Sequence, residues 1–311
     1  MKPTIYLSLG AVIKRVMAET LEDEIKWRND LLVEIGGKSA NYAIDPSFLR
    51  VWRIYGGQQG IWVDKQRTST ITEDGNGLAV SLLHKGNIYP DDFDESGVIY
   101  HYPVTNRPQS RDAGEIDAVK NCSRLKVPVF VITLSHIEPS KRDVYFGYVT
   151  MWDDHAKVFI VEFGTDEKTI IAEETDIPFQ LKIHEPKAKY ETTRRPDQAA
   201  FRISVIRRYG VQCAVCEMTV IDLIDAAHLV SKAEDGTDDP RNGLPMCVLH
   251  HRAFDKGLFA INPSKLSLET KPLGPSKLEL GITKNDLRHL QAKPQQNALL
   301  YCWEKWQKEN K

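Results

Sequence analysis

The stretch NGLPMCVLHHRAFDKG, residues 242–257, places two adjacent histidines directly after a cysteine-containing turn. It also carries an asparagine at its start and an aspartate near its end, in a chain that has only nine histidines. Two neighbouring residues at the start of a helix project roughly 100° apart, so adjacent imidazoles can serve two different sites. We therefore expect this segment to contribute to two separate sets of ligands.

The first set of ligands combines two short Cys-containing pairs. Cys213 and Cys216 are separated by two residues, as are Cys247 and His250, and 30 residues lie between the two pairs. A two-residue spacer lets a tight turn present both side chains to one ion, and three thiolates with one imidazole suit tetrahedral Zn²⁺. Four protein ligands leave no open position, so the pattern predicts a structural zinc site. The alternative is that the cysteines are small buried core residues.

The second set of ligands begins with His251. Asp255 follows it by four residues, on the same face of the expected helix. An imidazole and a carboxylate one turn apart suit a Mg²⁺ or Mn²⁺ ion that keeps positions open for water and phosphate. The alternative role for Asp255 is to fix the end of the helix.

Two more polar residues lie upstream and complete a longer pattern. His228 precedes Asn242 by 13 intervening residues, and eight residues separate Asn242 from His251. Together with the Cys-containing pairs, this pattern over residues 211–260 resembles the HNH nucleases, whose domain has the ββα-metal fold. The resemblance implies that His228 is the general base, that Asn242 holds the loop and the strand of His228 in register, and that His251 and Asp255 ligate the catalytic metal. A core histidine and a turn asparagine are the alternatives.

Basic and acidic neighbours of these residues add two expectations. Arg252 and Lys256 can contact phosphate, although isolated basic residues also occur on solvated faces. Many HNH nucleases have an aspartate metal ligand directly before the first histidine, and Ala227 stands at that position here. We expect Asp255 to replace it, with Asp225 as the second alternative.

The remainder of the chain predicts an α+β protein with two domains. Helical spacing at 11–35 and short β-branched and aromatic runs from about 50 to 165 predict a mostly-β domain over residues 1–182. The polar, basic residues 183–198 predict a linker. The third segment, 199–311, contains both ligand sets and flanking helices. Asp197 is expected to cap a helix that ends before Gly210, and the tail is expected to form helices broken near Pro294.

The first domain carries a second, weaker pattern over residues 55–134. It consists of a Gly-Gln-rich turn before Ile61, the run Tyr89-x-Asp91-Asp92-x-Asp94, a strand ending in Tyr102, Asn121 after an acidic helix, and a strand at Pro128. This order resembles the SRA (YDG) domains, which bind DNA with modified cytosine and flip that base into a pocket of a PUA-type barrel.

The SRA resemblance implies a role for three residues. Tyr89 and Tyr102 would stack on the flipped base, and Asp92 would accept the exocyclic amine of cytosine. The Tyr-Thr-Gly that follows the acidic turn in SRA domains is replaced by Tyr102-Pro103. The alternatives are an acidic surface turn for the run around Asp92 and a core position for Tyr102.

Composition and charge restrict the class of protein. The chain has 311 residues, of which 41% are hydrophobic and 27% charged, and no apolar run is long enough to span a membrane. Five cysteines form an odd, sparse set, which favours a reducing compartment. Residues 1–180 contain 20 Lys+Arg and 27 Asp+Glu, whereas residues 181–311 contain 21 and 16, so the second part is better suited to a polyanion. We expect the cytoplasm of a bacterial or archaeal cell.

These features predict a modification-dependent restriction endonuclease. Its partner would be double-stranded DNA containing 5-methylcytosine or a derivative, and its cofactors structural Zn²⁺ and catalytic Mg²⁺ or Mn²⁺. We expect a homodimer because two strands must be cut, and no membrane or small-molecule cofactor. One alternative is a non-catalytic DNA-binding protein with structural zinc, in which Ala227 marks a lost metal site. Another is an HNH nuclease that does not depend on DNA modification.

Overall fold

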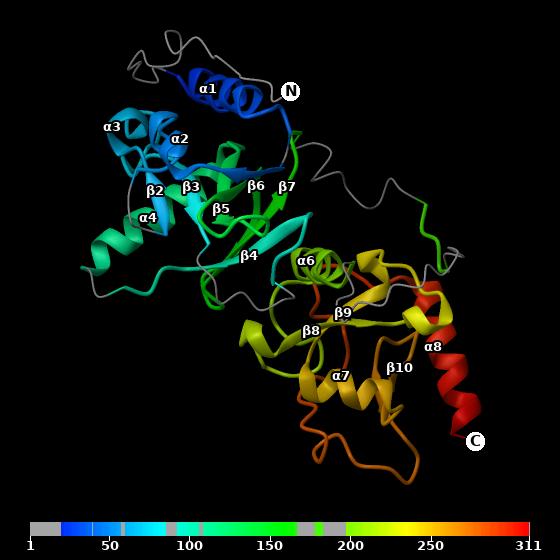
Figure 1. The fold of residues 1–311 in the computed structure, drawn as a ribbon. Helices are drawn as coiled ribbons and strands as arrows, with labels where there is room; N and C mark the ends of the chain where they lie inside the picture. The colour runs from blue at the N-terminus through cyan, green and yellow to red at the C-terminus, as the bar shows by residue number, and fades with distance from the viewer. Residues whose placement is uncertain are drawn as a thin grey trace, which may run out of the picture. The chain divides into compact units, whose positions relative to one another are not determined.

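The computed structural model describes residues 20–38, 40–56, 60–84, 92–105, 108–166, 178–182 and 197–310. These residues combine a large β-sheet with helices and a smaller hairpin-based region, which confirms the predicted α+β class (Figure 1). The chain divides into two compact units. The first comprises Met1–Ile88, Glu95–Trp152 and Val161–Ile171, and the second comprises Tyr89–Asp94, Asp153–Ile160 and Ala172–Lys311.

The large sheet has seven strands, in the order β2-β3-β5-β6-β7-β4, with β1 paired to β6. Parallel pairing joins β3 to β5, and the β1–β6, β2–β3 and β5–β6 pairs are antiparallel. The sequence predicted this texture from β-branched and aromatic runs, and β3 and β5 are buried along almost their whole length. The strands are β1 (Ala40–Ile44), β2 (Ile61–Val63), β3 (Ala79–Leu83), β4 (Gly97–His101), β5 (Val129–Leu134), β6 (Arg142–Asp153) and β7 (Val158–Phe163).

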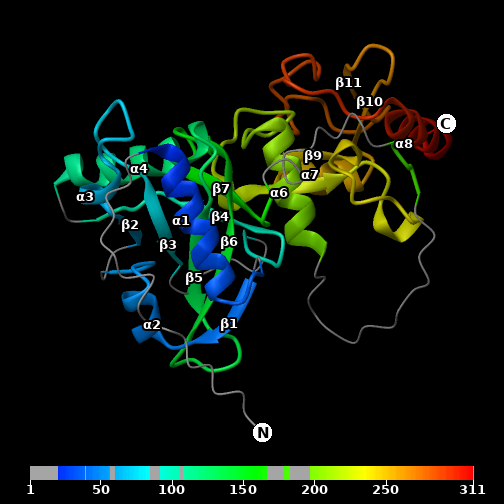
Figure 2. The ribbon, with the colours of Figure 1, turned by 90° about the horizontal axis from the view of Figure 1, so that it is seen from above.

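Helices α1 (Leu21–Glu34), α2 (Pro46–Val51), α3 (Lys65–Thr68) and α4 (Gln109–Arg124) accompany this sheet. Thr20 and Asp23 form a reciprocal capping box that fixes the start of α1. Leu31 and Leu32 of α1 pack in a core cluster with Phe130 of β5, so α1 lies against one face of the sheet (Figure 2). The helical spacing predicted for 11–35 is therefore confirmed from residue 21 onward, and residues 11–19 lie outside the described ranges.

A buried network of charged side chains ties α1 to the sheet. Arg28 and Glu24 are 0% exposed, and Nε of Arg28 donates to Glu24 at 2.8 Å. Nη1 of Arg28 donates to the carbonyl oxygens of Ala79, the first residue of β3, and of Pro128, which directly precedes β5. Arg67 donates a second guanidinium hydrogen bond to Glu24 at 2.8 Å. Loss of one member would leave the others charged or polar in an apolar interior.

The second unit is built on a two-stranded hairpin, β8 (Ile224–His228) and β9 (Gly243–Cys247). Helices α6 (Asp197–Tyr209) and α7 (Val248–Asp255) pack against it (Figure 1). The other elements are the short hairpin β10 (Phe259–Ile261) and β11 (Leu268–Thr270), helix α8 (Gln296–Glu309), and the 3-10 turns η3 (Ile221–Leu223), η4 (Lys232–Glu234) and η5 (Pro240–Asn242). Within the described ranges, no helix is long and apolar enough to cross a membrane.

The ends of the second unit test two sequence predictions. Helix α6 ends at Tyr209 as expected, and Gly210 closes it at a φ of +87°. The tail forms a helix only after Pro294, so the helix expected before this proline was a wrong prediction. The reason is backbone pairing: the carbonyl of Asn285 accepts from Leu268 N at 3.0 Å, and Leu287 N donates to Leu266 at 3.0 Å. This pairing keeps residues 285–287 extended against β11.

We predict that Arg28→Met lowers the free energy of unfolding by about 3 kcal/mol or more, because two backbone carbonyls and Glu24 lose a buried donor. Urea denaturation followed by tryptophan fluorescence measures this change. Lys26→Met is the matched control, because Lys26 forms an exposed (i, i+4) ion pair with Asp30 on the same helix and should change little. Equal midpoints for the two variants would contradict the role of Arg28.

Candidate functional site

The register of the β8–β9 hairpin sets the positions of the candidate residues. Ile224 lies opposite Cys247 at one end, and His228 lies opposite Gly243 at the other. Residues of a strand alternate between its two faces, so Asp225 and His228 point to opposite sides. Asp225 contacts His251 of α7, and the ring of His228 stacks on Phe201 of α6. The two helices therefore cover opposite faces of the hairpin.

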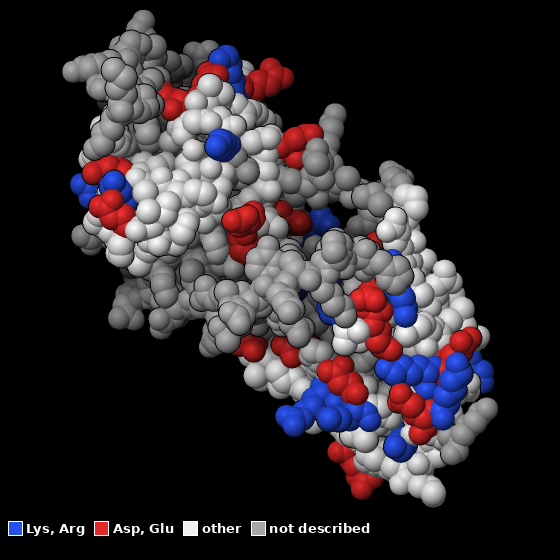
Figure 3. Space-filling view, turned by 45° about the vertical axis from the view of Figure 1, so that its right-hand side comes forward, with Lys and Arg blue, Asp and Glu red and all other residues white. Residues whose placement is uncertain are grey.

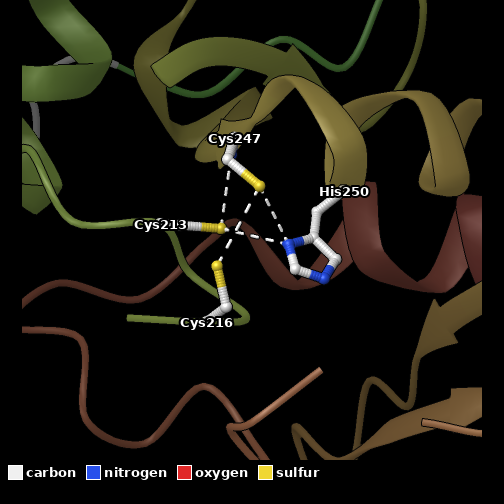
Figure 4. Close-up of side chains that lie close together, drawn as sticks. All are labelled: Cys213, Cys216, Cys247 and His250. Atoms are coloured by element: carbon white, nitrogen blue, oxygen red, sulfur yellow. Dashed lines mark hydrogen bonds between the residues drawn. The ribbon is translucent and has the colours of Figure 1, made fainter. Parts of the chain in front are cut away.

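Four side chains converge at one end of this hairpin, where β9 leads into α7. Figure 4 shows Cys213, Cys216, Cys247 and His250 pointing toward a common centre, and their donor atoms all lie within 4.8 Å of one another. Sγ of Cys216 is 3.9 Å from Sγ of Cys247. Nδ1 of His250 is 3.7 Å from Sγ of Cys213 and 3.0 Å from Sγ of Cys247. This cluster could hold zinc.

The spacing of the donor atoms fits a tetrahedral ion. Bonds of about 2.3 Å to sulfur and 2.0–2.1 Å to nitrogen place two sulfurs about 3.8 Å apart and a sulfur and a nitrogen about 3.6 Å apart. Most of the observed separations lie near these values. The surroundings also suit metal ligation: Nε2 of His250 lies 3.0 Å from the carbonyl of Leu280, and Cys247 N donates to Sγ of Cys213. The first contact orients the imidazole so that Nδ1 faces the sulfurs.

Burial favours the neutral forms of Cys213, Cys216 and His250 when no cation is present. It raises the pKa of Cys213 and raises that of Cys216 to about 12, and it lowers the pKa of His250. Thiolates are the species that bind Zn²⁺, so metal binding must displace the thiol protons. Ionising these thiols without a cation is therefore costly. Their convergence favours a metal site over the alternative of ordinary core cysteines, which need not lie together.

His251 faces the other way and lies between two carboxylates. Its Nδ1 is 3.0 Å from Oδ2 of Asp225, and its Nε2 is 3.7 Å from Oδ2 of Asp255. The hydrogen bond with Asp225 raises the pKa of His251; burial opposes this rise, and the charge of Asp255 adds to it. The two carboxylates contact different ring nitrogens, so in this arrangement one divalent cation could take the imidazole together with only one of them.

The structure also bears on the residue that stands in for the aspartate missing at position 227. Ala227 is 0% exposed and lies on the same face of β8 as Asp225, two residues earlier. Asp225 therefore presents its carboxylate to α7 from the strand face that Ala227 shares. It also lies closer to His251 than Asp255 does. The sequence alone favoured Asp255 over Asp225, and it does not show that Asp225 and Ala227 share one face, because this depends on the extended backbone of β8.

His228 ends β8 and is held by different partners. Its Nε2 lies 2.8 Å from Oδ1 of Asp238, and its ring lies 3.8 Å from that of Phe201, with an angle of 15° between the planes. Its side chain is 20% exposed. Within the described part of the chain, His228 makes no hydrogen bond to His251. Three residues along β8, about 10 Å in an extended strand, separate His228 from Asp225.

Asn242 is a fully buried brace beside His228. Its Oδ1 accepts from Val230 N at 2.9 Å, and its Nδ2 donates to the carbonyls of Val230 at 3.0 Å and Thr237 at 2.8 Å. Its own carbonyl accepts from Leu229 N at 2.7 Å. Every polar group of the side chain is thus used to join the residues after His228 to the loop before Asn242.

The residues expected to bind the flipped base are placed differently from the sequence prediction. Tyr89 lies outside the described residues. Asp92 is 3% exposed and its carboxylate pairs with Nη1 of Arg202 in α6, so it is neither in a surface turn nor open to a base in this structure. Tyr102 is 9% exposed and has the ammonium of Lys120 at 5.9 Å from its ring centroid. This burial matches the alternative of a core aromatic.

Basic side chains occur on the surface of the second unit. Arg252 of α7 is exposed, as is Lys256, which follows the helix. Figure 3 shows Lys and Arg side chains gathered at the lower right of the view, interspersed with Asp and Glu. Sequence reasoning did not single out Asp238 or Lys232, which contact each other next to His228. The adjacent acidic residues of GTDDP, 236–240, were the available signal.

A protein-family model matches this region of the chain. Residues 213–262 match the model of the HNH endonuclease family. This segment spans the four-residue metal cluster, the β8–β9 hairpin and α7. None of the curated proteins matches the chain.

Three solved structures are similar to the chain at low identity. The modification-dependent TagI restriction endonuclease is 18% identical, with 87% of this chain and 94% of that chain covered and a TM-score of 0.34. KRYPTONITE in complex with mCHG DNA and SAH is 18% identical, with coverage of 49% and 40% and a TM-score of 0.28. The type IV phosphorothioation-dependent restriction endonuclease ScoMcrA is 10% identical, with coverage of 87% and 56% and a TM-score of 0.27. These TM-scores are too low to define the fold.

We predict that the purified protein contains one zinc ion per chain and that Cys216→Ala abolishes this zinc and lowers the melting temperature. Cys216 is the informative position because its side chain is partly exposed, so little core packing is lost with it. Elemental analysis and thermal melting measure the two effects. Cys302→Ala is the control, because its thiol lies outside the cluster and donates to the carbonyl of Leu229. Unchanged zinc content in Cys216→Ala would contradict the site.

We also predict that Asp225→Asn lowers the pKa of His251 in protein that lacks a divalent metal at this site, because the hydrogen bond with Asp225 is the largest cause of the raised value. A raised pKa stabilises the folded state fully below the ordinary value of about 6.5, and this contribution disappears as the pH rises through the raised value. Asp225→Asn should therefore destabilise the protein more in acid than above this range.

Histidine NMR titration measures the change in the pKa of His251. Asp255→Asn is the matched control and should lower it less, because Oδ2 of Asp255 is 3.7 Å from the ring and its side chain is 62% exposed. A larger decrease in Asp255→Asn than in Asp225→Asn would contradict this ranking.

Proposed function

We propose that the protein is a metal-dependent DNA endonuclease whose HNH domain hydrolyses phosphodiester bonds. The observation that carries this proposal is the arrangement on the β8–β9–α7 unit within the matched segment. His228 ends the first strand, Asn242 braces the loop, and His251 on the helix faces two carboxylates. A structural module would need the four-residue metal cluster, but it would not need this second group of polar residues.

Each of these residues has a defined part in the proposed hydrolysis. His228 acts as the general base and takes a proton from the attacking water. Asn242 keeps the residues around His228 in place through its hydrogen bonds to Val230 and Thr237. His251 would hold a Mg²⁺ or Mn²⁺ ion together with one of its two neighbouring carboxylates, Asp255 or Asp225. When bound, such an ion supplies Lewis-acid stabilisation of the scissile phosphate and of the leaving 3′ oxygen.

The proposed substrate is double-stranded DNA that contains 5-methylcytosine or a derivative. This part of the proposal is supported by the SRA-like order of residues 55–134, and it implies a PUA-type barrel and base flipping by the domain at residues 1–182. Tyr89, Asp92 and Tyr102 are the proposed base-binding residues. Base flipping would require Asp92 to exchange Arg202 for the base, because its carboxylate is paired in this structure. Arg252 is proposed to contact phosphate, and a homodimer would supply the two active sites that a double-strand cut needs.

The pairing of Asp92 with Arg202 and the burial of Tyr102 favour one second candidate. In it, the HNH nuclease cuts DNA without regard to cytosine modification. The residues of the hairpin and α7 would then have the same roles, and the first unit would bind DNA or a protein by other means.

We predict that the protein cuts a plasmid carrying modified cytosines in the presence of Mg²⁺ or Mn²⁺ and spares the unmodified copy. His228→Ala and His251→Ala should each lower the rate by roughly 10²- to 10⁴-fold, since each removes a group acting on the proton or the phosphate. Gel analysis of matched plasmids bearing methyl, hydroxymethyl or glucosylated cytosine measures the preference. His289→Ala is the control, because this exposed histidine lies outside the β8–β9–α7 unit and hydrogen-bonds to the backbone carbonyl of Asp286.

The outcomes separate the two parts of the proposal. Equal cutting of all plasmids would remove the dependence on modification and leave the nuclease. Unchanged rates in both His228→Ala and His251→Ala would reject the HNH site itself.

A further inference from the structure

Two side chains, Phe201 and Asp238, fix the imidazole of His228. Phe201 lies flat beneath the ring, at 3.8 Å between centroids. Asp238 contacts Nε2 at 2.8 Å, and its other oxygen pairs with the ammonium of Lys232. Gly243, opposite His228 in the ladder, leaves room for Phe201, because a Cβ at this position would lie 2.6 Å from the Phe201 ring. An aromatic contact and a charged partner together restrict both the tilt and the rotation of the imidazole.

The partner of His228 is an ionised carboxylate. Burial acts to raise the pKa of Asp238, but hydrogen bonds from His228 and Lys232 outweigh it and hold the pKa below its ordinary value. An ionised carboxylate has no proton to donate. The hydrogen between the two residues therefore belongs to Nε2 of His228, and in the neutral imidazole Nδ1 is the nitrogen with a free electron pair.

The loop that carries Asp238 is itself held in place. Nδ2 of Asn242 donates to the carbonyl of Thr237, the residue directly before Asp238. Asp239, directly after it, accepts from Arg241 N at 2.9 Å and starts the η5 turn. Asp238 thus stands between two anchored neighbours, and its position relative to the strand of His228 is set by Asn242.

We propose that Asp238 is a positioning residue for the general base: it accepts the Nε2 hydrogen of His228 and so makes Nδ1 the atom that removes the proton from water. This inference rests on the nuclease function proposed above. In the step, Nδ1 takes one proton, the hydroxide oxygen bonds to phosphorus, and the bond from phosphorus to the 3′ oxygen breaks. The 3′ oxygen takes a proton from water, and Asp238 stays ionised beside the imidazolium.

The inference is tested by a double-mutant cycle in single-turnover cleavage. Asp238→Asn should lower the rate by roughly 10²-fold, because an amide no longer dictates which nitrogen carries the hydrogen. The double variant His228→Ala/Asp238→Asn should cut no more slowly than His228→Ala, since Asp238 acts only through this imidazole. Asp286→Asn, a carboxylate variant in the C-terminal part of the same unit, is the control and should cut at the normal rate.

A second measurement does not depend on activity. Nitrogen-15 NMR of histidine-labelled wild-type protein reports which ring nitrogen carries hydrogen, and His228→Ala identifies the signals of this residue by their loss. We expect Nε2–H in the wild-type protein and a gain of the Nδ1–H form in Asp238→Asn. Zinc content and melting temperature show whether each variant is folded, and the wild-type spectrum decides the tautomer even if Asp238→Asn does not fold.

The results distinguish this inference from the proposed function. Loss of cleavage in His228→Ala with a normal rate in Asp238→Asn overturns the role of Asp238 alone, as does an Nδ1–H imidazole in the wild-type protein. Additive losses in the double variant also overturn it, because they mean that Asp238 acts by a route other than His228. Normal cleavage in both His228→Ala and His251→Ala rejects the proposed function instead.

Discussion

The antiparallel pairing of β8 with β9 is the constraint on which the candidate site depends. Its register places Ile224 opposite Cys247 and His228 opposite Gly243, so one short ladder fixes both ends of the site. A shift by one residue would turn every side chain to the other face of the hairpin. Cys247 would then leave the thiol cluster and His228 would leave Phe201. The cluster at one end and the buried Asn242 at the other both act against such a shift, since the cluster joins Cys213 to the end of β9 and Asn242 joins Thr237 to Val230.

The two faces of the β8–β9 hairpin carry different sets of side chains because of this pairing. Asp225 and Ala227 lie on the face toward α7, which carries His251, whereas His228 lies on the face toward α6. The charged side chains also differ between the two faces. The face toward α7 brings two carboxylates next to one imidazole, while on the face toward α6 one carboxylate pairs with a lysine. The adjacent histidines of α7 extend the same principle, because His250 is buried among sulfurs and His251 is half-buried beside carboxylates.

The sequence was informative where the geometry is local and less so where it depends on distant segments. Ligand spacing of two residues predicted which four side chains converge, because a tight turn restricts what such a spacer can do. The side chain of Asp238 was not predicted, since its direction is set by hydrogen bonds of Asn242 and Asp239 within an irregular loop. The partner of Asp92 is 110 residues away along the chain, and no periodicity could indicate it. The same applies to the extended residues before Pro294, which pair with β11 and its neighbours despite a helical pattern.

Gly243 has a consequence for how such a hairpin can vary. Because Gly243 has no side chain, α6 can lie close enough to β9 for Phe201 and Val205 to occupy the space where a Cβ would be. Gly243 of β9, which has no functional group of its own, thus determines whether Phe201 can stack on the imidazole of His228. An alanine at 243 would require a smaller side chain at 201. The imidazole of His228 would then lose the aromatic ring that stacks on it. A larger residue at 243 is therefore compatible with the hairpin only if residue 201 becomes smaller at the same time.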